Sequence, residues 1–267
     1  MDIASIIGLT LGILAVFGGA LLEGLHLGSL LQLTAAIIVL GGTIGATVLS
    51  FPMKTVVEAL KAVLIVLTEP RHDNTSVIKE IVEYAMKSRR EGLISMESQL
   101  KNVSDEFLRR ALQMAVDGAD TKTMRETMEV ELDRLEAEGE LKAKVFEAAG
   151  GYSPTIGIIG AVLGLIHVMQ NLDDPSKLGG GIAVAFVATV YGVGSANLIY
   201  LPFASKLRVR HKQEMVAKEM MLQGAIGIQE GTNQRIIEEK LKSYLPAEQR
   251  VAKPEEKPAA IQEKAAA

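Results

Sequence analysis

The chain has 267 residues, of which 48% are hydrophobic and 22% charged, with a formal net charge of −4. It contains no cysteine, which excludes a disulfide framework, a thiolate zinc site and a cysteine nucleophile. Positive and negative charges are mixed along the chain, so nucleic acid is not an expected partner, because phosphate binding needs a clustered basic face.

Charged residues are excluded from four apolar blocks, at residues 3–22, 28–53, 148–172 and 178–205. Each block reaches the roughly 20 residues that a helix needs to cross a bilayer core about 30 Å thick. The first block does not fit a cleaved signal peptide, because Asp2 precedes it in place of basic residues and a second block follows closely. The pattern predicts an all-α membrane protein with four transmembrane helices.

The distribution of lysine and arginine predicts the topology. The link between the first two blocks contains neither residue, and the link between the last two contains only Lys177. Lys54 and Lys61 follow the second block, and Lys206 and Arg208 begin a basic run after the fourth. Because basic residues are retained on the cytoplasmic side, we expect both termini and the long middle region to be cytoplasmic.

Between the second and third blocks, apolar residues recur at helical spacing. One helix is predicted from a cap at Asp73 or Asn74 to a stop at Gly92. A short helix restarts at Ser95, and a further helix capped by Ser104 stops at a later glycine, Gly118.

A long charged helix is predicted to begin near residue 123 and to continue into the third block. After the fourth block the helical pattern extends to about residue 245, where periodicity ends. The predicted divisions are 1–53 for transmembrane helices 1 and 2, 54–147 for a helical cytoplasmic domain, 148–205 for transmembrane helices 3 and 4, 206–246 for a cytoplasmic C-terminal helix and 247–267 for a flexible tail.

The four blocks contain no Asp, Glu, Lys or Arg. Transport of protons or cations through hydrocarbon generally uses an ionisable group at depth, so the chain alone has no obvious proton carrier. His167 lies near the outer end of its block, where an imidazole reaches water. Gly157, Gly160 and Gly164 lie on nearly one helix face, which permits close approach of a helix of this chain or of another.

The sequence shows no paired nucleophile and base, no phosphate-binding glycine loop and no metal-ligand cluster. We therefore expect neither an enzyme nor a cofactor or metal site.

Three stretches of the last two blocks read YSPTIGIIGAVLGLIHVM at 152–169, NLDDP at 171–175 and IAVAFVATVYGVGSANLIYLP at 182–202. Together with KSRREGLISME at 87–97, they closely resemble the MotA family of bacterial flagellar stator subunits. The resemblance covers nearly the whole chain and includes the two-plus-two arrangement of the apolar blocks.

The resemblance implies a multi-pass protein of the bacterial inner membrane, five copies of which surround two copies of MotB. MotB is a single-span protein that supplies the membrane aspartate and a peptidoglycan anchor. Ion passage is thought to rotate the pentamer, which turns FliG in the C-ring of the rotor. The absence of carboxylates from the blocks agrees with this division of labour.

The resemblance also assigns roles to charged residues and prolines. It implies that Arg89 and Glu97 contact the rotor, although their signs also suit the end of one helix and the first turn of the next. It implies that Pro154 and Pro202 couple ion passage to movement, since proline removes a helix hydrogen bond and bends the helix. A simple junction between helical segments is the alternative at Pro154.

An ion pathway is implied at Thr189, Thr155 and Ala161. The family places threonines at the first two positions on an inner ring facing the MotB carboxylate, whereas a membrane threonine usually bonds to its own backbone. In sodium-driven members, threonines typically stand at the positions of Ala161 and Ala188. The two alanines favour protons; the alternative is that both only pack and that backbone carbonyls bind sodium.

Three alternatives remain open from the sequence. The first is a sodium-driven stator of the same family. The second is an energiser of outer-membrane processes of the ExbB/TolQ type, which has three spans rather than four. The third is a passive membrane scaffold without ion flux, which the small-residue faces do not exclude.

Overall fold

The computed structural model describes residues 2–67 and 73–250, and across these residues all regular structure is helical. Four helices are long and apolar enough to cross a membrane, namely Ile3–Leu22, Leu33–Ser50, Thr121–Gln170 and Leu178–Gln229. They contain most of each apolar block, so the predicted fold class with four transmembrane helices is confirmed.

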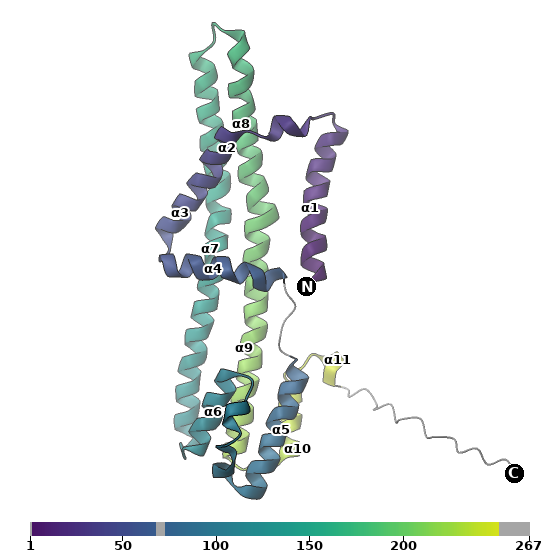
Figure 1. Ribbon diagram of the computed structural model, residues 1–267, viewed down its shortest axis with the longest axis vertical. Helices are drawn as coiled ribbons and strands as arrows, with labels where there is room; N and C mark the ends of the chain where they lie inside the picture. The colour runs from purple at the N-terminus through teal and green to yellow at the C-terminus, as the bar shows by residue number, and fades with distance from the viewer. Residues whose placement is uncertain (1, 68–72, 251–267) are drawn as a thin grey trace, which may run out of the picture. The chain divides into compact units, whose positions relative to one another are not determined.

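The chain divides into two compact units, whose helices are drawn in Figure 1. The first unit is built from residues 1–71 and 133–215, and the second from residues 72–132 and 216–267. The apolar blocks therefore belong to the first unit. Helix α7 begins in the second unit, and helix α9 ends in it.

The first two blocks form helices of different regularity. Helix α1 (Ile3–Leu22) is regular and is capped by Asp2, whose carboxylate accepts a hydrogen bond from the Ser5 N–H. The second block is irregular, in part because it contains a π-helical turn. Its elements are the 3-10 turn η1 (Leu27–Leu30), α2 (Leu33–Ala36), the π-helical turn η2 (Ile37–Gly41) and α3 (Gly42–Ser50).

The last two blocks belong to very long helices. Helix α7 (Thr121–Gln170) is continuous over 50 residues, which confirms that the charged helix runs into the third block. Helix α8 (Pro175–Ser195), the π-helical turn η5 (Ala196–Tyr200) and helix α9 (Leu201–Gln229) follow one another directly.

Helix α4 (Met53–Leu67) is an amphipathic element that the sequence analysis did not separate from its surroundings. Figure 1 shows it lying across α7 and α9. Its alanines Ala59 and Ala62 are buried in a core with Phe146 and Leu207.

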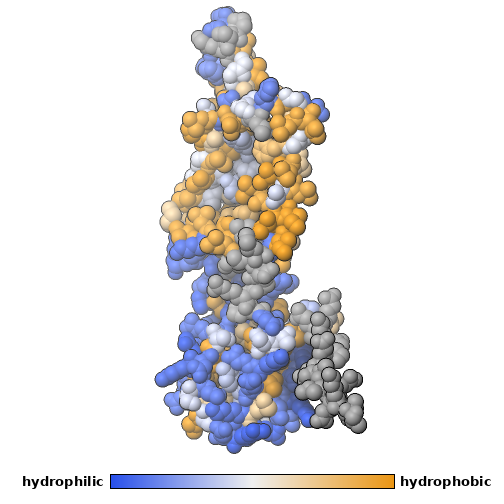
Figure 2. Space-filling view, turned by 45° about the vertical axis from the view of Figure 1, so that its right-hand side comes forward, coloured by the Kyte–Doolittle hydropathy of each residue, from blue (hydrophilic) through white to orange (hydrophobic). Residues whose placement is uncertain are grey.

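The opposite side of α4 exposes an apolar stripe, which comprises Met53, Val57, Leu60 and Leu64. These side chains continue an exposed hydrophobic surface formed by α1 and the second block, visible as orange atoms in Figure 2. Such a large exposed apolar surface is typical of contact with membrane or with further protein.

The second unit contains the remaining elements. They are α5 (Asn74–Glu91), the 3-10 turns η3 (Leu93–Met96) and η4 (Leu100–Asn102), α6 (Glu106–Val116), α10 (Gln234–Lys242), α11 (Ala247–Arg250) and the adjoining ends of α7 and α9. Its core includes the fully buried side chains of Ile81, Leu108, Met128, Ile226 and Leu241.

The predicted glycine stops are confirmed. Helix α5 is capped by Asp73, which accepts from the Thr75 N–H, and ends before Gly92, where φ is 84°. Helix α6 ends just before Gly118, where φ is 81°. Such backbone angles are readily adopted by glycine because it lacks a Cβ atom.

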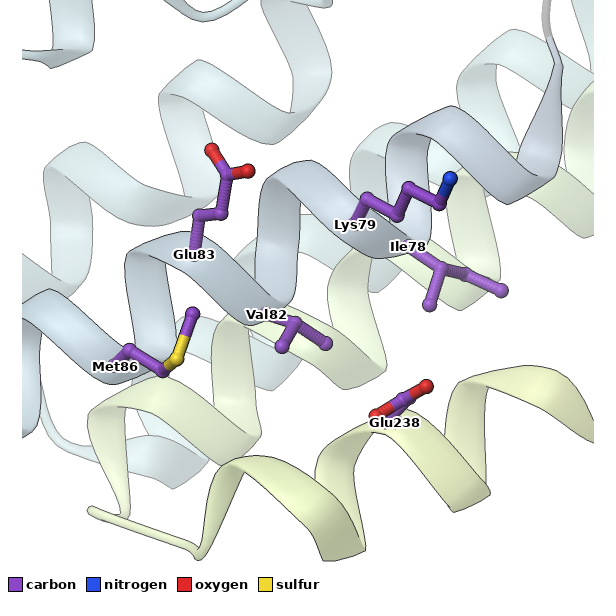
Figure 3. A pocket seen from close by; sticks show the side chains of 6 residues that line it. All are labelled: Ile78, Lys79, Val82, Glu83, Met86 and Glu238. Atoms are coloured by element: carbon purple, nitrogen blue, oxygen red, sulfur yellow. The ribbon is translucent and has the colours of Figure 1, made fainter. Parts of the chain in front are cut away.

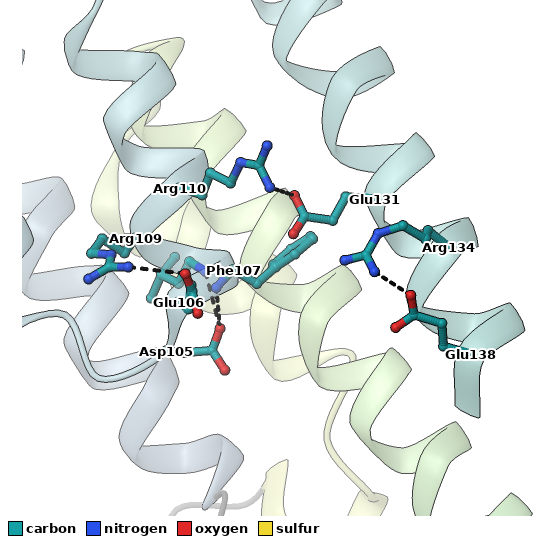
Figure 4. A network of polar contacts seen from close by, with 9 residues as sticks. Asp105, Glu106, Phe107, Arg109, Arg110, Glu131, Arg134 and Glu138 are labelled. Atoms are coloured by element: carbon teal, nitrogen blue, oxygen red, sulfur yellow. Dashed lines mark hydrogen bonds and ion pairs between the residues drawn. The ribbon is translucent and has the colours of Figure 1, made fainter. Parts of the chain in front are cut away.

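Two local predictions in this unit are wrong. The helix expected to restart at Ser95 consists instead of the two 3-10 turns η3 and η4. Asp105 rather than Ser104 caps α6, because its carboxylate accepts from the N–H groups of Phe107 (2.8 Å) and Leu108 (3.2 Å), as Figure 4 shows. The Ser104 hydroxyl donates to Glu80 instead, at 3.1 Å.

The C-terminal segment also differs from a single helix. The turn after α9 contains Gly231, where φ is 68°, and α10 restarts with Asn233 as its cap. Of the tail predicted at 247–267, the first residues form α11 and residues 251–267 lie outside the described part.

Candidate functional site

Helices α7 and α8 pack together through glycines. A Cβ atom on Gly164 would lie 2.8 Å from both the Ala185 N and the Gly181 O, and one on Gly192 would lie 2.6 Å from the Ser153 O. These neighbours are backbone atoms, which cannot move aside singly. The small-residue face predicted for the third block is therefore used inside the chain, to bring two spans into close contact.

A buried pair of hydroxyls joins the same two helices. The Ser153 Oγ lies 2.7 Å from the Ser195 Oγ, and Ser153 is 0% exposed. Because the Ser195 hydroxyl donates to the Tyr191 O at 2.7 Å, Ser153 is the donor within the pair. This pair could not be predicted from the sequence, since two serines 42 residues apart give no pattern.

The two candidate pathway threonines are exposed on the isolated chain. The Thr189 hydroxyl donates to the Ala185 O at 3.2 Å, and the Thr155 hydroxyl donates to the Tyr152 O at 2.8 Å. Both threonines therefore make the hydrogen bond to their own helix backbone that is usual for a threonine in a membrane helix. Each hydroxyl oxygen keeps lone pairs, so it can still accept a hydrogen bond from another group.

The two alanines of the ion argument lie in different environments. Ala188 is 0% exposed, and a Cβ on Gly160 would come 2.7 Å from the Ala188 Cβ, so this side chain packs between spans. Ala161 is half-buried. The packing alternative thus describes Ala188, whereas Ala161 keeps part of its surface accessible.

Pro202 follows a widened helical turn. It is the second residue of α9, directly after η5, in which the Leu201 N–H donates to the Ala196 O. Proline has no N–H to donate, and its ring crowds the carbonyl four residues earlier. A π-helical turn beside a proline relieves such crowding, and turns of this kind are frequent at functional sites.

Pro154 lies inside the continuous helix α7, so it does not mark a junction between two helices. Its missing N–H leaves the Gly150 carbonyl without its usual helical donor. A Cβ on Gly150 would lie 2.6 Å from the Leu201 Cδ2. The segment affected by Pro154 therefore contacts the residue immediately before Pro202.

Arg89 and Glu97 are both exposed and flank the turn between α5 and α6. Arg89 is in the last turn of α5, where the helix dipole favours a cation. Glu97 follows the 3-10 turn η3 and does not begin an α-helix. The helix dipole therefore explains the positive charge of Arg89 but not the negative charge of Glu97.

A shallow groove runs beside Arg89 between α5 and α10. Met86, Arg89, Arg90 and Gln234 line one end of it. Figure 3 shows the other part, where Ile78, Val82 and Met86 form an apolar strip with Glu83 and Glu238 at its edges. Lys79 also lines this second part, so its charges are mixed, whereas Arg89 and Arg90 make the first part basic.

Ion pairs join α7 to α9 in the first unit. The Arg208 guanidinium contacts both oxygens of Glu140 at 2.9–3.1 Å and also Glu147 at 2.9 Å. Hydrogen bonding to Arg208 lowers the pKa of the Glu140 carboxyl. The imidazole of His211 sits over Gly139, where a Cβ would lie 2.2 Å from its ring.

Metal binding finds no support in the part of the chain that the structure describes. Within residues 2–67 and 73–250, no three His, Asp or Glu side chains are grouped to hold a metal ion.

Comparisons with known proteins cover most of the chain. Residues 6–92 match the model described as Motility protein A N-terminal, and residues 99–220 match that of the MotA/TolQ/ExbB proton channel family. Motility protein A of Bacillus subtilis is 36% identical over an alignment of 255 residues that covers 94% of this chain and 93% of the relative.

Two solved structures are similar over the same extent. The C. jejuni MotAB structure has a TM-score of 0.88 at 30% identity and covers 94% of this chain and 99% of its own. The flagellar MotAB stator complex from Bacillus subtilis has a TM-score of 0.85 at 36% identity, with coverages of 92% and 98%.

Proposed function

The chain belongs to the MotA/TolQ/ExbB proton channel family, and we propose that it is a flagellar stator subunit that forms a proton-conducting complex with MotB. The complex converts the ion-motive force into torque on the rotor. The observation that carries this proposal is the absence of Asp, Glu, Lys and Arg from the four apolar blocks. An ion path lined by such spans requires a carboxylate from a partner.

The threonines suit a partner carboxyl that carries the proton. The hydroxyl hydrogens of Thr189 and Thr155 are engaged with backbone carbonyls, so their oxygens act as acceptors. A protonated carboxyl can donate to such an oxygen, whereas an ionised carboxylate cannot. Thr189 and Thr155 therefore favour passage of the partner aspartate in its neutral form.

Ala161 supports protons over sodium. A sodium ion that sheds water needs several oxygen ligands, and the methyl group of Ala161 offers none. Ala188 adds less to this argument, because its side chain packs against Gly160. The sodium-driven alternative would therefore rely on backbone carbonyls.

Coupling is assigned to the two prolines. Pro154 frees the Gly150 carbonyl, and Gly150 contacts Leu201 beside Pro202. A change in bend at either proline is therefore transmitted to the other through packed atoms. Arg89 and Glu97 would contact complementary charges on FliG and so transmit the resulting movement to the rotor.

Five copies of the chain around two of MotB, in the bacterial inner membrane, complete the proposal. The exposed apolar stripe of α4, a helix that also carries Lys54 and Lys61, supports a helix lying at the cytoplasmic membrane surface. Residues 54–147 and both termini would then be cytoplasmic, in agreement with the lysine and arginine distribution.

Co-purification tests the assembly. The chain, extracted from its own membranes through an affinity tag, is expected to bring a single-span protein with a membrane aspartate, and native mass spectrometry should count five and two copies. Recovery of the chain without such a partner would contradict the proposal. Recovery with an outer-membrane energiser system would favour the ExbB/TolQ alternative.

Swimming speed tests the ion. Speed should be insensitive to external sodium at fixed pH and should collapse with a protonophore while the sodium gradient is maintained. Speed that follows external sodium would establish the sodium-driven alternative.

A further inference from the structure

Asp2 is a buried carboxylate held by two cations. It is 8% exposed, its Oδ2 contacts the Lys206 Nζ at 2.7 Å and the Arg210 Nη2 at 2.5 Å, and its Oδ1 accepts from the Ser5 N–H at 3.2 Å. One oxygen thus caps α1 while the other binds α9. These contacts hold the pKa of the Asp2 carboxyl well below its usual range, chiefly through hydrogen bonding to Lys206.

The rest of α1 is only lightly packed within its unit. No residue from Ile3 to Leu22 is buried. Among the glycines of α1, only Gly12 lies close to another helix: a Cβ atom there would lie 3.2 Å from the Leu198 Cδ2. Asp2 is therefore the main polar attachment of the first span to the end of α9 nearest the membrane.

The attachment lies just beyond the proposed bend. Lys206 and Arg210 follow Pro202 by one and two helical turns, so both lie on one face of α9. Two cations at this spacing repel each other unless an anion lies between them. A bend at Pro202 that displaced this face would have to move Asp2 with it or break both ion pairs.

We infer that Asp2 is a positioning residue that fastens the inner end of the first span to α9 below Pro202, so that the two helices move as one piece. The torque consequence rests on the proposed stator function, whereas the attachment itself does not. The first span then opposes free bending of α9 and directs movement at Pro202 into the cytoplasmic part.

The Asp2→Asn variant separates the two roles of this side chain. Asparagine caps a helix as well as aspartate does, so the bond to Ser5 is kept while the charge is lost. Glu23→Gln is the matched control, because Glu23 is exposed at the other end of the same helix. The cysteine-free chain allows spin labels at two introduced cysteines, Ala4→Cys and Val209→Cys, both at exposed positions.

Pulsed electron paramagnetic resonance on the purified stator complex, with labelled chains diluted among unlabelled ones, measures the distance between α1 and α9. We expect one narrow distance distribution in the parent and in Glu23→Gln, and a broadened one in Asp2→Asn. If Asp2→Asn does not accumulate, Lys206→Gln with Arg210→Gln gives the same test from the opposite side.

Torque is measured in parallel, as the speed gained by a loaded motor for each stator incorporated. Broadening together with loss of torque per stator supports the inference. An unchanged distance distribution overturns the attachment, whatever the function of the complex. Broadening with full torque per stator overturns the positioning role and leaves the proposed function intact.

Discussion

The close packing of helices α7 and α8 depends on the absence of a side chain at Gly164. A methyl group there would meet the backbone of α8 at 2.8 Å, whereas one on Gly151 of the same helix would meet nothing within 4 Å. We therefore expect Gly164→Ala to destabilise the purified chain by about 1–3 kcal/mol, the usual effect of overpacking.

Thermal unfolding in detergent measures this effect, with Gly151→Ala as the matched control. The control should unfold like the parent, or slightly later, since alanine has the higher helix propensity. Equal stability of the two variants would mean that α7 and α8 are not in close contact.

Arg89 and Glu97 test the rotor contact at the same scale. Reversal of either charge, by Arg89→Glu or Glu97→Lys, should reduce motility, and opposite changes on FliG should partly restore it, because such contacts supply complementarity and orientation. Arg90→Glu is the control and should have the smaller effect. Normal swimming of the Arg89→Glu, Glu97→Lys double variant with an unchanged rotor would refute the assignment.

Several residue-level features lay beyond the sequence analysis for physical reasons. Ser104 and Asp105 are both good cap residues, and only the path of the chain decides which one reaches the free N–H groups. Asp2 was read only as evidence against a signal peptide, since its cationic partners lie more than 200 residues away.

Among the elements, the π-helical turn η5 and Pro202 lie next to each other and together shape the start of α9. Pro202→Ala restores a backbone N–H and removes the crowding that η5 relieves. Membrane insertion and MotB binding should therefore persist while torque is lost. Co-purification and the speed of loaded motors measure the two properties separately.

Failure of the Pro202→Ala protein to accumulate would assign the residue to folding instead. Unchanged torque in a fully assembled complex would contradict the proposed role of the prolines in coupling ion passage to movement.

Helix α4 offers a test of membrane position, because the chain has no tryptophan. Leu60, on the exposed apolar stripe, is 59% exposed, and Val130 of the second unit is 70% exposed. Leu60→Trp should be quenched by brominated lipids in reconstituted vesicles, because an amphipathic helix buries its apolar face at the lipid boundary. Val130→Trp should not be quenched, and equal quenching would contradict the proposed topology.

The elements that sequence could predict were those fixed by local chemistry. The apolar blocks, the long charged helix and the glycine stops follow from periodicity and from backbone freedom at Gly92 and Gly118. The π-helical turns and the separate helix α4 pack against segments distant in the sequence. Such contacts leave no periodic signal in the sequence.

For the whole molecule, the proposed division of labour makes the chain the scaffold and the partner the source of the membrane carboxylate. The spans lack a carboxylate, while α7 and α9 extend the third and fourth spans into long helices that reach the second unit. The proposed division of labour means that neither subunit alone should conduct ions.

On the proposed function, the chain generates torque as a stator subunit. The most direct measurement follows a bead attached to one flagellum while the chain is expressed from an inducible promoter in a deletion strain. We expect flagellated but paralysed cells before induction, and after induction motors that restart and gain speed in discrete, similar steps. Deletion cells that already rotate the bead, or induced cells that never restart although chain and partner reach the membrane, would contradict it.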